Sequence, residues 1–338
     1  MTPTLPRHID VCNGDADGLC ALLQWRLAHP LHAELVTGLK REHDLLARVQ
    51  AQAGDEVMVV DLAFEPHRAG VQRLLDVGVR VRYVDHHVCT APPEHPLLDA
   101  HLDADSQVCS GLLINRLLGG RFARWAVVCA HGDNLHAPAE ALGRSLRLSA
   151  AQQQALRRLG EAINHNAYGD TLADVRVPPA ALLTLLREHT DPISALAEPR
   201  VQGLLQGMDE DLARARQVRP EREAAHAAIW CLPDADWARR ASGSLANSLA
   251  SERPDQACAV LRPLASGHWL ISVRAPRHSP FGAAALCQRF GGGGRQAAGG
   301  IDALPPDRRS AFVEAFWSHR WSHDGPHIEV EQPPQRHP

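Results

Sequence analysis

The sequence has one lysine, few aromatic residues and no long apolar run. Lys40 is the only lysine among 35 basic residues, so arginine is the side chain available for binding phosphate. Aromatic residues make up 4% of the chain, which gives few candidates for stacking on nucleobases. No apolar run reaches the length of a membrane span, and residues 1–12 lack the charged start and apolar stretch of a signal peptide. We therefore expect a cytoplasmic protein with no membrane partner.

The sequence also lacks paired cysteines and a strong charge imbalance. None of its eight cysteines forms a CxxC pair, and most lie in apolar runs, where a reduced thiol packs as a small hydrophobe. We therefore expect neither a zinc knuckle nor a disulfide framework. The net charge of −4 does not indicate a non-specific DNA-binding protein, which would be more basic.

The length of 338 residues exceeds the usual size of one domain and favours two. In the first part of the chain, strand patterns alternate with helix patterns. The expected strands are residues 9–12, 33–37, 57–60 and 79–84, and the expected helices are 18–28, 44–51, 66–76, 109–118 and 122–131. This βαβ alternation predicts a parallel sheet with helices on both faces. Ser106 or Ser110 is the expected N-cap of the helix at 109–118.

Residues 135–217 show mostly helical patterns, and the last of these helices reads as a charged connector that ends before Pro220. The C-terminal part has its own alternation. Its expected strands are 226–231, 257–263 and 269–273, and its expected helices are 242–251 and 281–289. The prediction is an α/β protein with an N-terminal domain at 1–217, a smaller α/β domain at 224–325 and a disordered tail at 332–338.

Acidic side chains follow three of the predicted strands. Asp15 and Asp17 follow the first strand, Asp61 follows the third, and Asp85-His86-His87 ends the fourth. In an open parallel sheet the carboxyl ends of the strands lie at one edge, so these side chains should converge. Taken singly, each motif is also typical of a helix cap or a solvated turn. Asp133, after an apolar helix, is a further candidate ligand.

Carboxylates combined with one or two imidazoles suit Mn²⁺ or Mg²⁺. Two such ions can activate water and stabilise both the attacking and the leaving oxygen in a reaction at phosphorus.

A glycine-rich stretch in the second domain is the candidate for anion binding. Gly292, Gly293 and Gly294 can expose backbone N–H groups, and Arg295 adds a fork of donors. The pair Ser272 and Arg274 ends a predicted strand and offers a second phosphate contact. The alternatives are a flexible loop and a solvated strand end.

These motifs, in this order over residues 8–305, resemble the DHH-family phosphoesterases with a C-terminal DHHA1 domain, a RecJ-like and oligoribonuclease-like superfamily. The resemblance implies an active site in the cleft between the two domains. It implies one metal on Asp17, Asp61, His86 and Asp133, and a second on Asp15 and the shared Asp61. Asp85 would orient the histidine pair, and His87 would face the phosphate. Ser272, Arg274 and the stretch 291–299, with Gly292, Gly293, Gly294 and Arg295, would bind the rest of the substrate.

Three positions depart from the family pattern. Val11 stands where many relatives have a histidine, and Asn13 stands where RecJ-like members have an aspartate, so the second ion would be weakly held. Gly294 replaces the histidine of the second domain, where Arg295 is the candidate substitute.

The resemblance implies a phosphodiesterase or phosphatase, with nuclease activity among the options. It would act on a nucleotide, a cyclic dinucleotide or a short single-stranded oligonucleotide, using Mn²⁺ or Mg²⁺. Two alternatives stay open: a nucleotide-binding regulatory protein on a weakened DHH scaffold, and a polyphosphatase or pyrophosphatase. A homodimer also stays open.

Overall fold

The structure is a computed structural model that describes residues 6–42 and 44–321. The tail expected at 332–338 lies outside these residues. The chain divides into two compact units after Asp211. This position lies inside helix α9 (Pro199–Gln217), just before the boundary at 218–224 that the sequence predicts.

The first unit is built on a five-stranded sheet in the order β2-β1-β3-β4-β5. All of its neighbouring strands pair in parallel. Its strands are β1 (His8–Asn13), β2 (Glu34–Gly38), β3 (Glu56–Val60), β4 (Arg80–Asp85) and β5 (Leu98–Leu102). The parallel sheet predicted from the sequence is confirmed, although its edge strand β5 was not anticipated.

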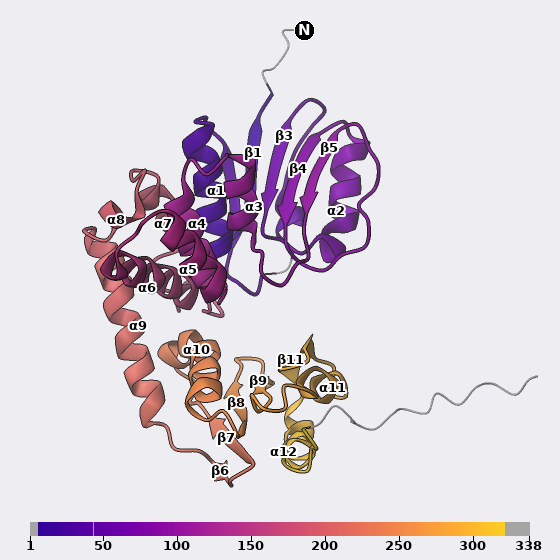
Figure 1. The fold of residues 1–338 in the computed structure, drawn as a ribbon. Coiled ribbons are helices and arrows are strands. Elements are labelled where there is room, and N and C mark those ends of the chain that lie inside the picture. Colours follow the sequence, from indigo (N-terminus) through magenta and orange to yellow (C-terminus); the bar gives the residue numbers. More distant parts are fainter. Residues whose placement is uncertain (1–5, 43, 322–338) are drawn as a thin grey trace, which may run out of the picture. The chain divides into compact units, whose positions relative to one another are not determined.

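Alternation along β1 explains why helices cover both faces of this sheet. Ile9 and Val11 pack in one apolar cluster with Phe64 and other residues of α2 (Phe64–Asp76). Asp10 points to the opposite face, where it is buried in an ion pair with Arg26 of α1 (Ala16–Ala28). The sheet therefore lies between α1 and α2, as Figure 1 shows.

Further helices follow the sheet. They are α3 (Ser110–Leu117), α4 (Ala123–Gly132), α5 (His136–Ser145), α6 (Ala150–Asn166), α7 (Pro179–Leu186), α8 (Pro192–Ala195) and α9. A capping box of Ser149 and Gln152 starts α6. The prediction of a helix at 44–51 is wrong. Only a 3₁₀ turn forms, at Leu45–Arg48, and the chain becomes extended at Val49.

The second unit holds a six-stranded mixed sheet in the order β10-β11-β9-β8-β7-β6. Its strands are β6 (Arg222–Glu223), β7 (Ala227–Cys231), β8 (Ala257–Pro263), β9 (Trp269–Arg274), β10 (Gly293–Arg295) and β11 (Ala298–Leu304). Its helices are α10 (Asp236–Glu252), α11 (Ala283–Gln288) and α12 (Arg309–Trp317). Alternate residues of β7 and β8 face α10 on one side and α11 and α12 on the other. The smaller α/β unit is confirmed.

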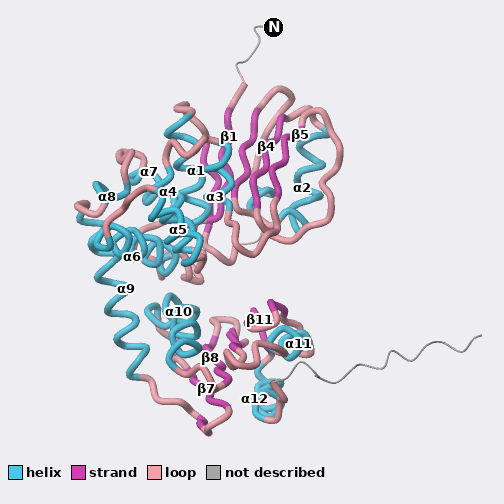
Figure 2. The backbone as a smooth tube through the Cα atoms, in the orientation of Figure 1, coloured by secondary structure: helices cyan, strands magenta, loops and turns pink. Residues whose placement is uncertain are grey.

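The glycine-rich stretch is part of this sheet. Figure 2 shows strand in this region, and β10 and β11 form a hairpin in which Gly294 pairs with Gly299. The N–H groups of Gly291 and Gly292 are already bonded to carbonyl groups of Gln288 and Cys287 in the preceding helix. The alternative of a flexible loop is therefore wrong, because residues 293–295 form a paired strand. Among the described residues, no helix is both long and apolar enough to cross a membrane.

Candidate metal centre

The strand order places the candidate site at a crevice that open α/β sheets use for ligands. Strand β1 lies between β2 and β3. The chain passes from β1 to β2 on one side of it and then crosses back to β3 on the other side. Ligands of such sheets bind at the carboxyl ends of the strands where the order reverses. Asp15 and Asp17 follow β1 and Asp61 follows β3, so both sides of this crevice end in carboxylates.

The turn after β1 and the start of α3 fix the first two carboxylates. Asp15 caps α1, because its side chain accepts a hydrogen bond from the N–H of Gly18 at 3.0 Å. Asp17 accepts hydrogen bonds from the N–H groups of Ser110 at 2.7 Å and Gly111 at 2.8 Å. These N–H groups lie at the positive end of α3, which favours a carboxylate there.

The N-cap predicted for this helix, Ser106 or Ser110, is therefore wrong. The capping position is Cys109, which makes no side-chain cap bond. The distant Asp17 satisfies the first N–H groups of α3 instead, and sequence spacing could not show this because about ninety residues separate the partners. Ser110 also donates from its hydroxyl group to Asp61 at 3.3 Å.

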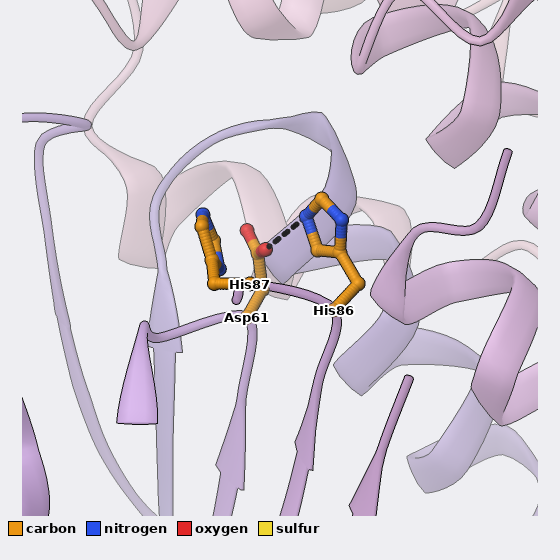
Figure 3. A group of neighbouring side chains, drawn as sticks. All are labelled: Asp61, His86 and His87. Carbon is orange, nitrogen blue, oxygen red and sulfur yellow. Dashed lines mark ion pairs between the residues drawn. The ribbon is translucent and has the colours of Figure 1, made fainter. Parts of the chain in front are cut away.

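Asp61 leaves β3 in an unusual backbone conformation. Its φ of 57° lies in the left-handed region, which aspartate enters more readily than most residues with a side chain. Its N–H group donates to the carbonyl oxygen of Val84 at 3.0 Å, so the neighbouring strand holds this turn. The turn directs the carboxylate of Asp61 to the histidines that follow β4, as Figure 3 shows.

Three carboxylates and one imidazole meet at this edge of the sheet. The Nε2 atom of His86 lies 3.5 Å from Asp61 Oδ1, 3.8 Å from Asp133 Oδ2 and 3.9 Å from Asp17 Oδ2. These separations are at or beyond the limit of a hydrogen bond. Ligand atoms of Asp61, His86 and His87 also lie within 4.8 Å of one another. Three carboxylates thus lie within 4 Å of His86 Nε2.

Close packing of helices brings the last carboxylate into the group. Asp133 ends α4, whose Gly132 lies against Ala16 of α1 and Gly160 of α6. A Cβ atom at position 132 would collide with the methyl group of Ala16. The glycine therefore allows α4 to approach α1 closely, and this approach places Asp133 beside Asp17.

The ionised carboxylates are costly without a cation. Burial, followed by the charges of Asp15 and Asp17, raises the pKa of Asp61 well above its ordinary value. Burial and the charge of Asp17 raise the pKa of Asp133 to about 6, against the opposing charge of Lys40. A divalent cation would offset this repulsion, and the mixed carboxylate and imidazole donors suit Mn²⁺ or Mg²⁺. The residues present therefore fit the cation expected from the sequence.

His87 is held differently from His86. Its Nδ1 atom lies 2.7 Å from Oδ1 of the fully buried Asp85, and 43% of its side chain is exposed. Burial alone would lower the pKa of His87, but the hydrogen bond and charge of Asp85 raise it above its ordinary value. Asp85 thus orients His87 and leaves its Nε2 atom as the one able to meet a ligand.

Lys40 is a site residue that the sequence did not assign. It follows β2, forms an ion pair with Oδ2 of Asp15, and donates to Oδ1 of Asn164 at 3.1 Å. Burial lowers its pKa, but the charges of Asp15, Tyr168 and Asp133 and the hydrogen bond to Asp15 together raise it well above its ordinary value. The sequence feature that could have pointed to Lys40 is composition, because it is the only lysine of the chain.

A pocket of about 290 Å³ opens onto these side chains. Its lining includes Asp15, Lys40, Asp61, His86 and Asp133. Its volume is at the lower end of the range for ligand pockets. A larger pocket of about 580 Å³ lies at the opposite edge of the sheet, around the starts of β3 and β4. The carboxylates and histidines gather at the smaller pocket.

The candidate residues of the second unit form their own group. Ser272 and Arg274 lie on β9, and the guanidinium of Arg274 donates through Nε and Nη2 to Oδ1 of Asn247 at 3.0 and 2.9 Å. The side chain of Arg295 is exposed at the end of β10, the strand that Gly293 begins. Because Gly294 has φ 137° and a Cβ there would meet the backbone of Gly299, this position does not accept the family histidine without a backbone shift.

No protein-family model and no curated protein sequence matches the chain. Solved structures do match its fold. A DHH-domain protein described as a member of a family of ribosomal proteins has a TM-score of 0.60 at 14% identity, and the match covers 92% of this chain and 86% of that one. RecJ from Thermus thermophilus, in complex with Mn²⁺, has a TM-score of 0.56 at 17% identity, covering 92% of this chain and 51% of RecJ. This chain therefore spans about half the length of that RecJ.

A third match is PggH from Vibrio cholerae, described as a pGpG-specific phosphodiesterase. Its TM-score is 0.54 at 13% identity, and the match covers 91% of this chain and 97% of PggH. At these identities the likeness shows the fold. The chain has the architecture of DHH-domain proteins, with a parallel sheet in the first unit and a mixed sheet in the second. The fold that the sequence predicts is confirmed.

Proposed function

We propose that this protein is a metal-dependent phosphoesterase that hydrolyses a phosphate ester bond of a nucleotide, a cyclic dinucleotide or a short oligonucleotide. The observation that carries the proposal is the meeting of Asp17, Asp61 and Asp133 around Nε2 of His86. Further support comes from two proteins of the same fold, one described as a pGpG-specific phosphodiesterase and one as an exonuclease bound to manganese.

Each of these residues would have a distinct role in the reaction. Asp17, Asp61, His86 and Asp133 would hold a divalent cation, preferably Mn²⁺. The cation would act as a Lewis acid toward the phosphate and favour deprotonation of the attacking water. His87, oriented by Asp85, would contact the phosphate through Nε2 and supply a proton to the leaving oxygen.

The second unit would bind the rest of the substrate. Arg274 presents a guanidinium that Asn247 holds in place, and Arg295 offers an exposed one. Arginine forks pair well with phosphate oxygens. We therefore propose that Ser272, Arg274 and the hairpin residues Gly293 to Arg295 contact the parts of the substrate that do not react.

A substrate panel tests the proposal. The protein is incubated with Mn²⁺ and, in separate reactions, short 5′-phosphorylated oligonucleotides, cyclic dinucleotides, phosphoadenosine phosphate and polyphosphate. Release of mononucleotide or phosphate by the parent protein, and none by Asp61→Asn, is the expected result. Tight nucleotide binding with Mn²⁺ but no product from any ester would refute hydrolysis and favour a binding protein. Turnover of polyphosphate alone would refute the nucleotide specificity.

A further inference from the structure

The side chain of Lys40 lies where a second cation would be expected. Its ammonium group pairs with Oδ2 of Asp15 and donates to Asn164 on α6 at 3.1 Å. It also lies 5.5 Å from the ring centroid of Tyr168, and its backbone N–H donates to the carbonyl oxygen of Ala167 at 3.1 Å. Lys40 comes shortly after β2. Its position is fixed by contacts with α6 and with the residues that follow α6.

This contact engages the second oxygen of the Asp15 carboxylate and places a positive charge beside it. One oxygen accepts from the N–H of Gly18, and the other accepts from Lys40. Asp17, Asp61 and Asp133 differ, since among the described residues they form no ion pair with lysine or arginine and meet at His86 instead. Asp15 lies beside Asp61, but it differs from Asp17, Asp61 and Asp133 in having an ammonium partner.

The neighbouring positions on β1 add little to a second cation site. Val11 is completely buried in the cluster with α2, and its aliphatic side chain has no atom that can bind a cation. Asn13 lines the pocket but contributes a neutral amide. Apart from the shared Asp61, the charged ligand left for a second ion is Asp15, which is already neutralised.

We propose that this site holds one divalent cation and that the ammonium of Lys40 takes the place of the second. This inference rests on the proposed function and specifies which positive charges the site contains. An ammonium has three N–H donors, and two are used by Asp15 and Asn164. Because Lys40 also lines the pocket of the metal centre, the third donor binds an oxygen of the substrate phosphate.

The first test counts metal without substrate. The protein is stripped of metal, reloaded with Mn²⁺, freed of excess ions and analysed by plasma mass spectrometry. We expect one Mn²⁺ per chain in the parent, one in Asp15→Asn and almost none in Asp61→Asn. Two ions in the parent, falling to one in Asp15→Asn, would overturn the lysine inference while leaving the proposed function intact. No ion in the parent would overturn both.

The second test measures phosphate binding in the Mn²⁺-loaded protein by calorimetry with inorganic phosphate. Lys40→Met should weaken binding roughly tenfold or more at unchanged Mn²⁺ content, because a charge-assisted hydrogen bond is lost. Arg48→Met is the matched control, since Arg48 is a half-exposed cation paired with Glu42, and it should bind phosphate like the parent.

If Lys40→Met does not fold, Asp15→Asn with Lys40→Met removes both charges of the pair and should show the same loss. Equal phosphate affinity in the parent and the lysine variant would overturn the role of Lys40.

Discussion

At the scale of the residue, Asp61 combines a left-handed backbone with a buried carboxylate that faces three other acids. Asparagine tolerates the same backbone region and has the same shape, so Asp61→Asn removes the charge with little other change. We expect Mn²⁺ content and activity to fall almost to zero, whereas the melting temperature of the metal-free protein should stay or rise, because one of several buried like charges is gone.

Metal analysis and thermal melting on the same samples check this expectation. Asp99→Asn, at a half-exposed carboxylate paired with Arg82, is the control that should keep its metal. Parent-like Mn²⁺ content in Asp61→Asn would mean that Asp61 is not a ligand.

Arg295 is the residue that allows the second unit to be tested. Its side chain is exposed beside Gly294, where the family pattern has a histidine. Arg295→Ala should raise the KM for the true substrate roughly tenfold, with unchanged Mn²⁺ content, since a charge-assisted phosphate contact contributes about 1.5–3 kcal/mol. Arg277→Ala, another exposed arginine of this unit, should leave KM unchanged. Unaltered kinetics for Arg295→Ala would leave the phosphate contact to Arg274.

At the scale of the element, the packing of α4 against α1 decides where Asp133 lies. Gly132→Ala places a methyl group against Ala16, and such overpacking costs about 1–3 kcal/mol. We expect a lower melting temperature and weaker Mn²⁺ binding, because α4 must move away from α1. The matched control is Gly203→Ala in α9, where a Cβ meets nothing within 4 Å and the helix should be stabilised slightly. Equal metal affinity in Gly132→Ala and the parent would contradict this account.

A second element-scale contact joins the loop after β4 to the start of α2. Glu65 accepts hydrogen bonds from Arg68 and from the N–H and hydroxyl groups of Thr90, and these bonds lower its pKa from 4.5 to about 2. A carboxyl whose pKa is lowered by folding stabilises the protein above its unfolded pKa, and this stabilisation is lost as the pH falls through the folded pKa.

Glu65→Gln should therefore reduce the melting temperature above pH 4.5 and converge with the parent as the pH falls toward about 2. The effect should be small, because Glu65 is solvent-exposed. Melting curves across this pH range test it, with the exposed Glu94→Gln of the same loop as control. A constant difference at every pH would show that ionisation of Glu65 is not involved.

The elements differ in how well the sequence predicts them. The buried strand β3 carries a continuous apolar run, and β1 and β4 carry apolar residues interrupted by Asp10 and Arg82. Each strand ends at an acidic motif, so both the sheet and the main candidate residues could be predicted. The edge strand β5 has polar residues and is partly exposed, which removes that signal. The bonds from α3 to Asp17 and from Lys40 to Asp15 join distant segments, so they depend on tertiary packing that no local pattern encodes.

At the scale of the whole molecule, the division after Asp211 predicts a test of how independently the two units unfold. The proposed metal ligands all lie before Asp211. A ligand at about one hundred times its Kd stabilises the folded state by about 2.7 kcal/mol. We expect Mn²⁺ to raise the unfolding temperature of the first unit and to leave that of the second unit unchanged. Asp61→Asn should abolish this shift. Movement of both transitions together would show that the units unfold as one.

The single lysine has a consequence for proteolysis. A lysine-specific protease can cut this chain at one peptide bond, between Lys40 and Arg41. In the folded protein the side chain it must recognise is held by Asp15 and Asn164, so cleavage requires that this contact first open. The cut would separate Asp15 and Asp17 from Asp61, His86 and Asp133. One scission would thus leave the ligands of the candidate centre on two different fragments.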